Sequence, residues 1–141
     1  METYFVDSNV FFYAKIMDKE YGAACARVLN MTVEGRFKAV TSSLAIVELA
    51  NALRKYGLSN EVTDVVDAVF SLDIQIFEVD PLDVREAVAI FDRFKVSPYD
   101  CTHAATMRKA GTDKIISADR DFEKIAWIKR MDPKDFPLSG T

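Results

Sequence analysis

The sequence predicts an α/β protein, a three-layer α/β/α sandwich around a parallel sheet. Short apolar runs typical of buried strands alternate with longer stretches whose apolar residues recur at helical spacing. Strands that alternate with helices pair in parallel through right-handed crossovers, so helices cover both faces of the sheet. The chain has 141 residues, half of them hydrophobic, which is enough for one packed domain spanning residues 1–141.

The first quarter of the chain is expected to form two strands and two helices. Tyr4–Val6 is an aromatic and β-branched run that is too short for a stable helix, so we expect a buried strand there. A helix should begin at Ser8. A second, alanine-rich helix should cover Tyr21–Val33 and end at Gly35, and a second strand should follow at Phe37–Val40.

The middle of the chain predicts two more helices and a third strand. Ser43 is the expected N-cap of a helix that runs through several leucines and ends at Tyr56, where Gly57 closes it. Another helix should cover Glu61–Ser71. The apolar, β-branched run Ile74–Val79 predicts the third strand, which the following Asp-Pro pair ends.

The chain from Leu82 onward is expected to hold two long helices, a strand, a short helix and an edge strand. Apolar spacing predicts the first long helix, and Ser97 with a proline behind it marks the start of the second. In chain order, the expected elements are Leu82–Phe94, Pro98–Ala110, Lys114–Ser117, Asp119–Lys124 and Trp127–Ile128.

Composition restricts the function classes. The net charge is −4, with 22 acidic residues against 18 Lys and Arg, so there is no global basic field to attract nucleic acid. A nuclease whose metal ions supply local positive charge remains compatible. Cys25 and Cys101 lack zinc-site spacing and indicate a reducing compartment. Neither a signal peptide nor a membrane span is recognisable, so we expect a cytoplasmic protein with no membrane partner.

Acidic residues follow the predicted strands at the edge where such sheets bind ligands. In parallel α/β sheets the ligand crevice lies outside the carboxyl ends of the strands. Four acids are expected there: Asp7, Glu48, Asp100 and Asp119. Gathered carboxylates raise one another's pKa values unless a cation binds between them. Oxygen ligands without a Cys or His cluster favour Mg²⁺ or Mn²⁺, ions suited to phosphodiester hydrolysis.

Each acid also has a structural interpretation. Asp7 and Asp119 can cap the helices that follow them, and Asp121 can interact with the dipole of its helix as a first-turn acid. Asp100 lies three residues after Ser97, which is the spacing of a capping box. Glu48 lies too far into its helix for that role, but it can lie on a solvated face.

The only histidine, His103, lies three residues after Asp100 and shares its helical face. It can contact a substrate or support a ligand from that position. A single histidine beside Ala104 and Met107 is more simply explained as a half-buried side chain, and that is what we expect.

Four segments together resemble the PIN-domain family of metal-dependent ribonucleases, which includes the VapC-type toxins of toxin–antitoxin pairs. The segments are Val6–Val10, Ser43–Leu49, Tyr99–Ala105 and Ile116–Phe122. Each segment is a weak signal alone, but the four in this order and spacing are fairly specific, and they extend over nearly the whole chain.

The resemblance implies a five-stranded sheet of order 3-2-1-4-5, Mg²⁺ or Mn²⁺ as the cofactor, and endonucleolytic cleavage of RNA. It also implies a homodimer and, for a VapC-type toxin, a VapB-type antitoxin that blocks the acidic cleft. The implied metal-binding and catalytic acids are Asp7, Glu48, Asp100 and Asp119, with Asp121 as an additional ligand and with Asn9 and Ser117 as supporting residues. The family does not require a particular side chain at the position of His103.

Two other readings remain open at this point. A PIN fold without activity would serve as a protein-binding unit. A phosphoryl-accepting receiver module also gathers acids around Mg²⁺, but it would place adjacent acids after the first strand, where this chain has Asp7 followed by Ser8. It would also use an accepting aspartate after the third strand, and Asp80 is followed by Pro81.

Overall fold

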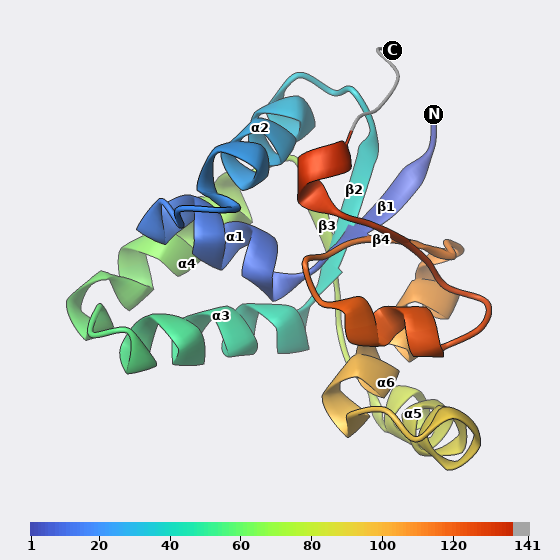
Figure 1. The fold of residues 1–141 in the computed structure, drawn as a ribbon. Coiled ribbons are helices and arrows are strands. Elements are labelled where there is room, and N and C mark those ends of the chain that lie inside the picture. The colour runs from blue at the N-terminus through green and yellow to red at the C-terminus, as the bar shows by residue number, and fades with distance from the viewer. Residues whose placement is uncertain (137–141) are drawn as a thin grey trace.

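The computed structural model of the chain describes residues 1–136, so the predicted domain boundary at residue 141 lies outside the described part. Its centre is a five-stranded, fully parallel sheet of order β3-β2-β1-β4-β5, which confirms the predicted topology (Figure 1).

The strands are β1 (Thr3–Val6), β2 (Lys38–Ser42), β3 (Ile74–Phe77), β4 (Lys114–Ile116) and β5 (Lys129–Met131). The α-helices are α1 (Ser8–Ile16), α2 (Gly22–Val33), α3 (Ser43–Lys55), α4 (Val62–Ser71), α5 (Pro81–Phe94) and α6 (Pro98–Ala110). The described residues also form three short 3₁₀ helices, η1 (Ser59–Glu61), η2 (Arg120–Lys124) and η3 (Pro133–Asp135).

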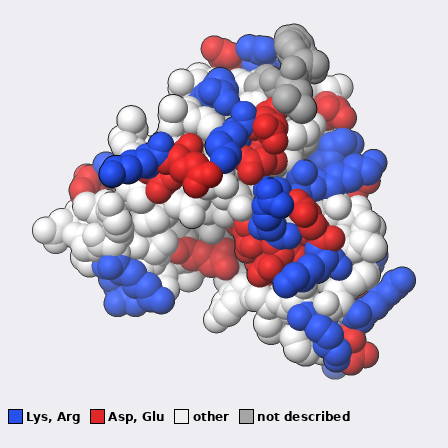
Figure 2. Space-filling model, viewed as in Figure 1, with Lys and Arg blue, Asp and Glu red and all other residues white. Residues whose placement is uncertain are grey.

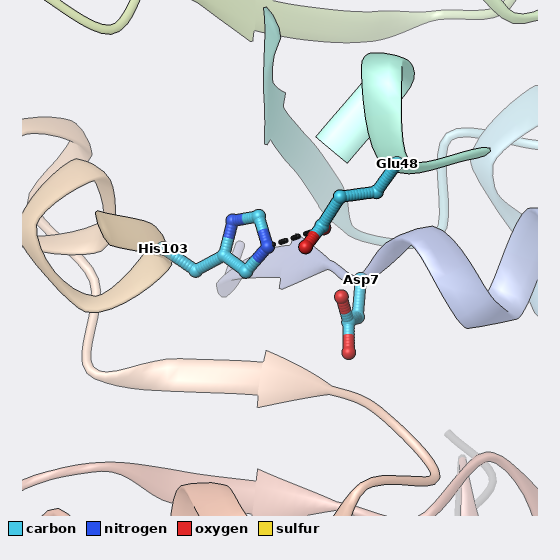
Figure 3. A group of neighbouring side chains, drawn as sticks. All are labelled: Asp7, Glu48 and His103. Carbon is cyan, nitrogen blue, oxygen red and sulfur yellow. Dashed lines mark hydrogen bonds and ion pairs between the residues drawn. The ribbon is translucent and has the colours of Figure 1, made fainter. Parts of the chain in front are cut away.

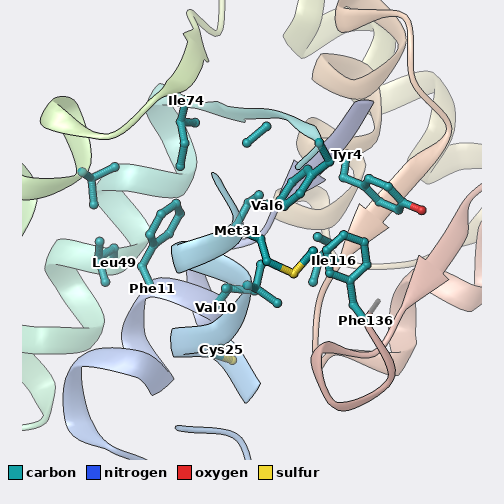
Figure 4. Close-up of a cluster of buried hydrophobic side chains, with 14 of the residues drawn as sticks. Tyr4, Val6, Val10, Phe11, Cys25, Met31, Leu49, Ile74, Ile116 and Phe136 are labelled. Atoms are coloured by element: carbon teal, nitrogen blue, oxygen red, sulfur yellow. The ribbon is translucent and has the colours of Figure 1, made fainter. Parts of the chain in front are cut away.

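Helices cover both faces of the sheet, as the three-layer prediction requires. Successive side chains of a strand point to opposite faces. Tyr4 and Val6 accordingly pack with Phe11, Cys25 and Leu49 in a cluster under α1 to α4 (Figure 4). The intervening side chains, such as Phe5 and Val40, pack under α5 and α6 in a second cluster. The sheet is therefore buried on both faces, and only its edges and strand ends remain for a site.

The register of the central strands positions the carboxyl edge of the sheet. Val6 of β1 pairs with Ile116 of β4, so the residues after these two strands, Asp7 and Ser117, emerge side by side. The Asp7 N–H donates to the Ile116 carbonyl over 3.1 Å. Helix α3 starts directly after β2, which brings its first turns to the same edge.

Two predicted strand boundaries were wrong. The fifth strand is Lys129–Met131 and not Trp127–Ile128, because the Ile128 side chain is a core residue whose N–H donates to Ile125 within a turn. The third strand ends at Phe77 and not at Val79, because the backbone leaves the sheet there and the Val79 N–H donates to the Ser43 hydroxyl over 3.3 Å.

The predicted N-cap of α3 was also wrong by one residue. Strand β2 continues through Ser42, and the Ser42 hydroxyl accepts from the Ala45 N–H over 3.1 Å. Ser43 is the first helical residue. With Ser42 as the cap, Glu48 still lies beyond the reach of a capping box, so this acid has no capping role.

Among the described residues, none of the helices is long and apolar enough to cross a membrane.

Candidate metal centre

Asp7 is the most deeply buried of the acids at the carboxyl edge, with a relative exposure of 6%. One carboxylate oxygen, Oδ1, caps α1 by accepting from the Ser8 N–H over 2.8 Å. The other, Oδ2, accepts from the Ser117 hydroxyl over 2.6 Å and from the Asn9 amide over 3.2 Å. The predicted supporting residues therefore lie against Asp7, and the capping interpretation of Asp7 holds for only one of its two oxygens.

Glu48 and His103 form the second part of this group. Glu48 lies in α3 and His103 in α6, and Glu48 Oε1 is 2.6 Å from His103 Nε2 (Figure 3). The His103 ring is only 1% exposed and lies against the rings of Phe5 and Phe122. Donor atoms of Asp7, Glu48 and His103 lie within 4.8 Å of one another. The expectation that His103 would be half-buried was therefore wrong.

A second group of carboxylates comes from α6 and from the loop after β4. Ligand atoms of Asp100, Asp119 and Asp121 lie within 4.8 Å of one another. Asp119 caps η2, since its Oδ1 accepts from the Asp121 N–H over 2.9 Å. The exposed Asp121 also pairs with Lys124 over 3.1 Å. All five predicted acids thus lie in two groups, and His103 is the additional member.

Burial and mutual repulsion raise the pKa values of the buried acids. Burial is the main cause for Asp100, and the charges of Asp119, Asp7 and Glu48 add to it, so the pKa of Asp100 rises to about 7 despite the opposing effect of His103. Burial likewise raises the pKa of Asp7. A cation bound between the carboxylates would reverse both effects, because it would stabilise their charged forms.

The capping-box interpretation of Asp100 was not borne out in the described residues. The Ser97 hydroxyl accepts from the Tyr99 N–H over 3.1 Å, whereas no hydrogen bond joins the Asp100 carboxylate to the Ser97 backbone. The reciprocal capping box lies instead at the start of α5, between Asp80 and Asp83. Since the Asp80 carboxylate caps that helix, it is not placed as the phosphoryl acceptor that a receiver module would need.

One further residue stabilises this edge of the sheet and was not predicted from the sequence. The Arg130 side chain of β5 is 6% exposed, and its guanidinium donates to the Ser117 carbonyl and to Glu123, each over 2.8 Å. It thus connects β5 to η2 and to the loop that carries Asp119. No sequence pattern distinguishes this arginine from the exposed basic residues, because its burial depends on strand pairing.

A hollow of about 560 Å³ extends to one of these carboxylates, that of Glu48. It is lined by residues of α3 between Leu44 and Lys55, Glu48 among them, and by Tyr99 of α6. Tyr99 is 61% exposed. Figure 2 shows acidic side chains gathered near the middle of this face of the molecule, with Lys and Arg side chains around them. An aromatic ring, that of Tyr99, and a cation, Lys55, therefore line the hollow together with Glu48.

The chain is similar to known proteins in both sequence and fold. The family model of the PIN domain matches residues 4–128. Two curated relatives are ribonuclease VapC23 of Mycobacterium tuberculosis, 29% identical over 116 residues that cover 82% of this chain and 91% of the relative, and ribonuclease VapC13 of the same species, 23% identical over 127 residues that cover 89% and 97%.

Solved structures share the fold at low sequence identity. The Mycobacterium tuberculosis toxin VapC20, described as cleaving the sarcin–ricin loop, superposes with a TM-score of 0.75 at 17% identity, covering 88% of this chain and 95% of that one. VapBC2 of Rickettsia felis, solved on a promoter DNA fragment, superposes with a TM-score of 0.70 at 13% identity, covering 92% and 97%.

Proposed function

Because the chain belongs to the PIN-domain family, we propose that it is a metal-dependent endoribonuclease, an RNA-cleaving hydrolase that acts as the toxin of a VapBC-type pair. One observation carries this proposal. Carboxylates from four separate parts of the chain, represented by Asp7, Glu48, Asp100 and Asp119, meet at the carboxyl edge of the sheet in two neighbouring groups.

The donor set fits Mg²⁺ or Mn²⁺. Asp7 and Glu48 would hold a divalent ion on one side, and Asp100 and Asp119 on the other, with Asp121 as an additional ligand. Hard oxygen donors suit these ions, and the buried carboxylates with raised pKa values would gain from a positive charge. When bound, such an ion makes water a better nucleophile near neutral pH and stabilises charge on phosphate oxygens.

The supporting residues would keep the Asp7 carboxylate in place. Ser117 and Asn9 both donate to Asp7 Oδ2, and the Asn9 amide also donates to the Ser117 hydroxyl over 3.2 Å. These hydrogen bonds restrict the rotation of Asp7 before any ion binds. Preorganised ligands lose less conformational freedom on binding a metal or a transition state.

The RNA strand would enter through the hollow between α3 and α6. Tyr99 offers an exposed ring on which an unpaired base can stack, and Lys55 offers a cation for a phosphate. The net charge of −4 gives no general attraction for RNA, so bound metal ions would supply the local positive charge at the scissile phosphate.

The partners follow from the same family assignment. Solved structures that share the fold include a toxin–antitoxin complex from Klebsiella pneumoniae and the Rickettsia felis VapBC2 complex. We accordingly propose that a VapB-type antitoxin binds this chain and blocks its acidic site, and that the chain forms a homodimer. The cytoplasm stays the predicted location.

The test is cleavage of a mixed panel of structured and single-stranded RNAs with Mg²⁺, with Mn²⁺ and with chelator. We expect metal-dependent cleavage by the wild-type chain and a loss of at least about 100-fold in Asp100→Asn, because a metal ligand is lost. Asp92→Asn is the matched control, since Asp92 is an exposed acid on α5 outside both groups. Retention of cleavage in Asp100→Asn, or in the presence of chelator, would contradict the proposal.

A further inference from the structure

The buried contact between His103 and Glu48 joins α6 to α3 at the centre of the site. We propose that His103 is a positioning residue that holds the Glu48 carboxylate for metal binding. This inference deepens the proposed function and rests on it, because it assigns a role to a side chain that the family pattern leaves unspecified. It depends on three features: the 2.6 Å contact, the burial of the ring and the surroundings of its second nitrogen.

The direction of the hydrogen bond follows from the His103 ring. Among the described residues, its Nδ1 is buried and has no hydrogen-bond partner. A proton on Nδ1 alone would leave a buried donor unpaired and would aim the Nε2 lone pair at a carboxylate oxygen. The neutral form with the proton on Nε2 avoids both problems. The doubly protonated form avoids only the second, because its buried Nδ1–H stays unpaired. In either of them Nε2–H donates to Glu48 Oε1.

The surrounding rings keep this donor in a fixed position. Phe5 of β1 and Phe122 of η2 lie 5.3 and 6.3 Å from the His103 ring, measured between ring centroids. Glu48, by contrast, is 27% exposed and has a long side chain that solvent alone would leave free to rotate. A buried donor that holds Oε1 leaves Oε2 available to a cation beside Asp7. Hydrogen bonds to ligating carboxylates commonly tune metal affinity.

Direct coordination by His103 is the competing arrangement, since a ring nitrogen of His103 lies within 4.8 Å of donor atoms of Asp7 and Glu48. The two roles exclude each other at any moment, because Nε2 cannot donate a proton to Glu48 and a lone pair to a metal together. Positioning keeps an all-oxygen site suited to Mg²⁺ or Mn²⁺, whereas coordination would introduce an imidazole ligand that favours Zn²⁺, Fe²⁺ or Ni²⁺.

The experiment measures Mn²⁺ binding to the full chain in the absence of RNA, from the electron paramagnetic resonance signal of free Mn²⁺. His103→Leu removes the donor but keeps an apolar side chain, and we expect it to weaken Mn²⁺ binding by about 10–100-fold. His103→Gln places an amide donor at a similar reach, and we expect it to restore most of the affinity. His103→Asn is too short to reach Glu48 and should behave like His103→Leu.

Several results would overturn the inference. The first is that His103→Leu folds and binds Mn²⁺ as tightly as the wild type. If His103→Leu does not fold, equal Mn²⁺ affinities of His103→Gln and His103→Asn would also overturn the inference. A further loss on adding His103→Leu to Glu48→Gln would also contradict it, because His103 should act only through Glu48. A directly bonded nitrogen signal in the pulsed spectrum of bound Mn²⁺ would assign coordination instead.

Failure of this inference can be separated from failure of the proposed function. Metal affinity is read without RNA, whereas the nuclease assignment depends on cleavage that Asp100→Asn abolishes. A chain that binds Mn²⁺ through the Glu48 and His103 pair but cuts no RNA would support the positioning role and refute the ribonuclease. A chain that cuts RNA but whose Mn²⁺ affinity does not change on substitution of His103 would support the ribonuclease and refute the positioning role.

Discussion

Asp7 uses its two carboxylate oxygens for different tasks. Oδ1 stabilises the start of α1, and Oδ2 is held by Ser117 and Asn9 at the edge of the site. Among the described residues no such set of donors holds Asp100, and its partial burial beside other negative charges raises its pKa to about 7. At the scale of single residues, the metal-free site therefore contains two carboxyl groups with raised pKa values, and the carboxylate of Asp7 is the one that hydrogen-bond donors hold in place.

The raised pKa of Asp100 predicts how the stability of the metal-free protein depends on pH. The folded chain binds this proton more tightly than the unfolded chain, where the pKa is near 3.8. The resulting stabilisation is fully present below the unfolded pKa and is lost as the pH rises through about 7. Asp100→Asn does not titrate, so we expect it to be more stable than the wild type by about 1–2 kcal/mol at pH 8, a modest value because the carboxyl is partly solvated.

Urea unfolding in chelator between pH 4 and pH 8 measures this difference. The wild-type curve should fall toward high pH relative to that of Asp100→Asn, while Asp92→Asn should follow the wild type. Parallel curves for the wild type and Asp100→Asn would show that Asp100 ionises normally.

At the scale of elements, short connections between strands and helices bring the functional side chains to one edge. β1 passes into α1 at Asp7, and β2 passes into α3 at Ser42 and Ser43, without intervening loops. Glu48 is therefore only two turns from the end of its strand. α6 reaches the same edge from the other face of the sheet, and its packing sets the distance between His103 and Glu48.

The corrected cap of α3 predicts different roles for two neighbouring serines. Ser42 is fully buried and its hydroxyl accepts from the Ala45 N–H, so Ser42→Ala should cost about 1–2 kcal/mol of unfolding free energy. Ser43 is exposed and makes a longer contact of 3.3 Å with the Val79 N–H, so Ser43→Ala should cost about 0.5 kcal/mol or less. Chemical denaturation of both variants at one pH measures the difference. A larger loss of unfolding free energy in Ser43→Ala than in Ser42→Ala would mean that Ser43 is the N-cap after all.

At the scale of the whole molecule, the folded chain gathers acids that are distant in sequence. Asp7, Glu48, Asp100 and Asp119 come from different parts of the sequence and meet only when the sheet and its flanking helices are complete. An ion held by these groups binds the folded state and not the unfolded chain, so it stabilises the fold by mass action.

Divalent metal should therefore raise the melting temperature. At about 100 times its dissociation constant, an ion adds about 2.7 kcal/mol, or about 6–10 °C for a chain of this length. Asp7→Asn should lose most of this shift and Asp92→Asn none of it. Thermal unfolding with Mn²⁺, with chelator and with NaCl at matched ionic strength measures the effect. If NaCl raised the melting temperature as much as Mn²⁺ does, the effect would come from screening of the repulsion between the acids and not from a bound ion.

The sequence by itself determined the features that depend on local interactions. The strand order was implied by the resemblance of four segments to the PIN-domain family, and the structure confirms it. Apolar spacing and turn residues by themselves predicted the helices and four of the five strands to within a few residues. Local patterns carry this information because capping and amphipathic burial act over a few residues.

Only the tertiary structure decided the features that depend on contacts between distant elements. The fifth strand lies at Lys129–Met131 because pairing with β4 selects its register, and β2 extends to Ser42 because it pairs with β3. The hydrogen bond between Glu48 and His103 joins residues 55 positions apart. No local pattern encodes it, since it exists only where α3 and α6 approach each other across the carboxyl edge of the sheet.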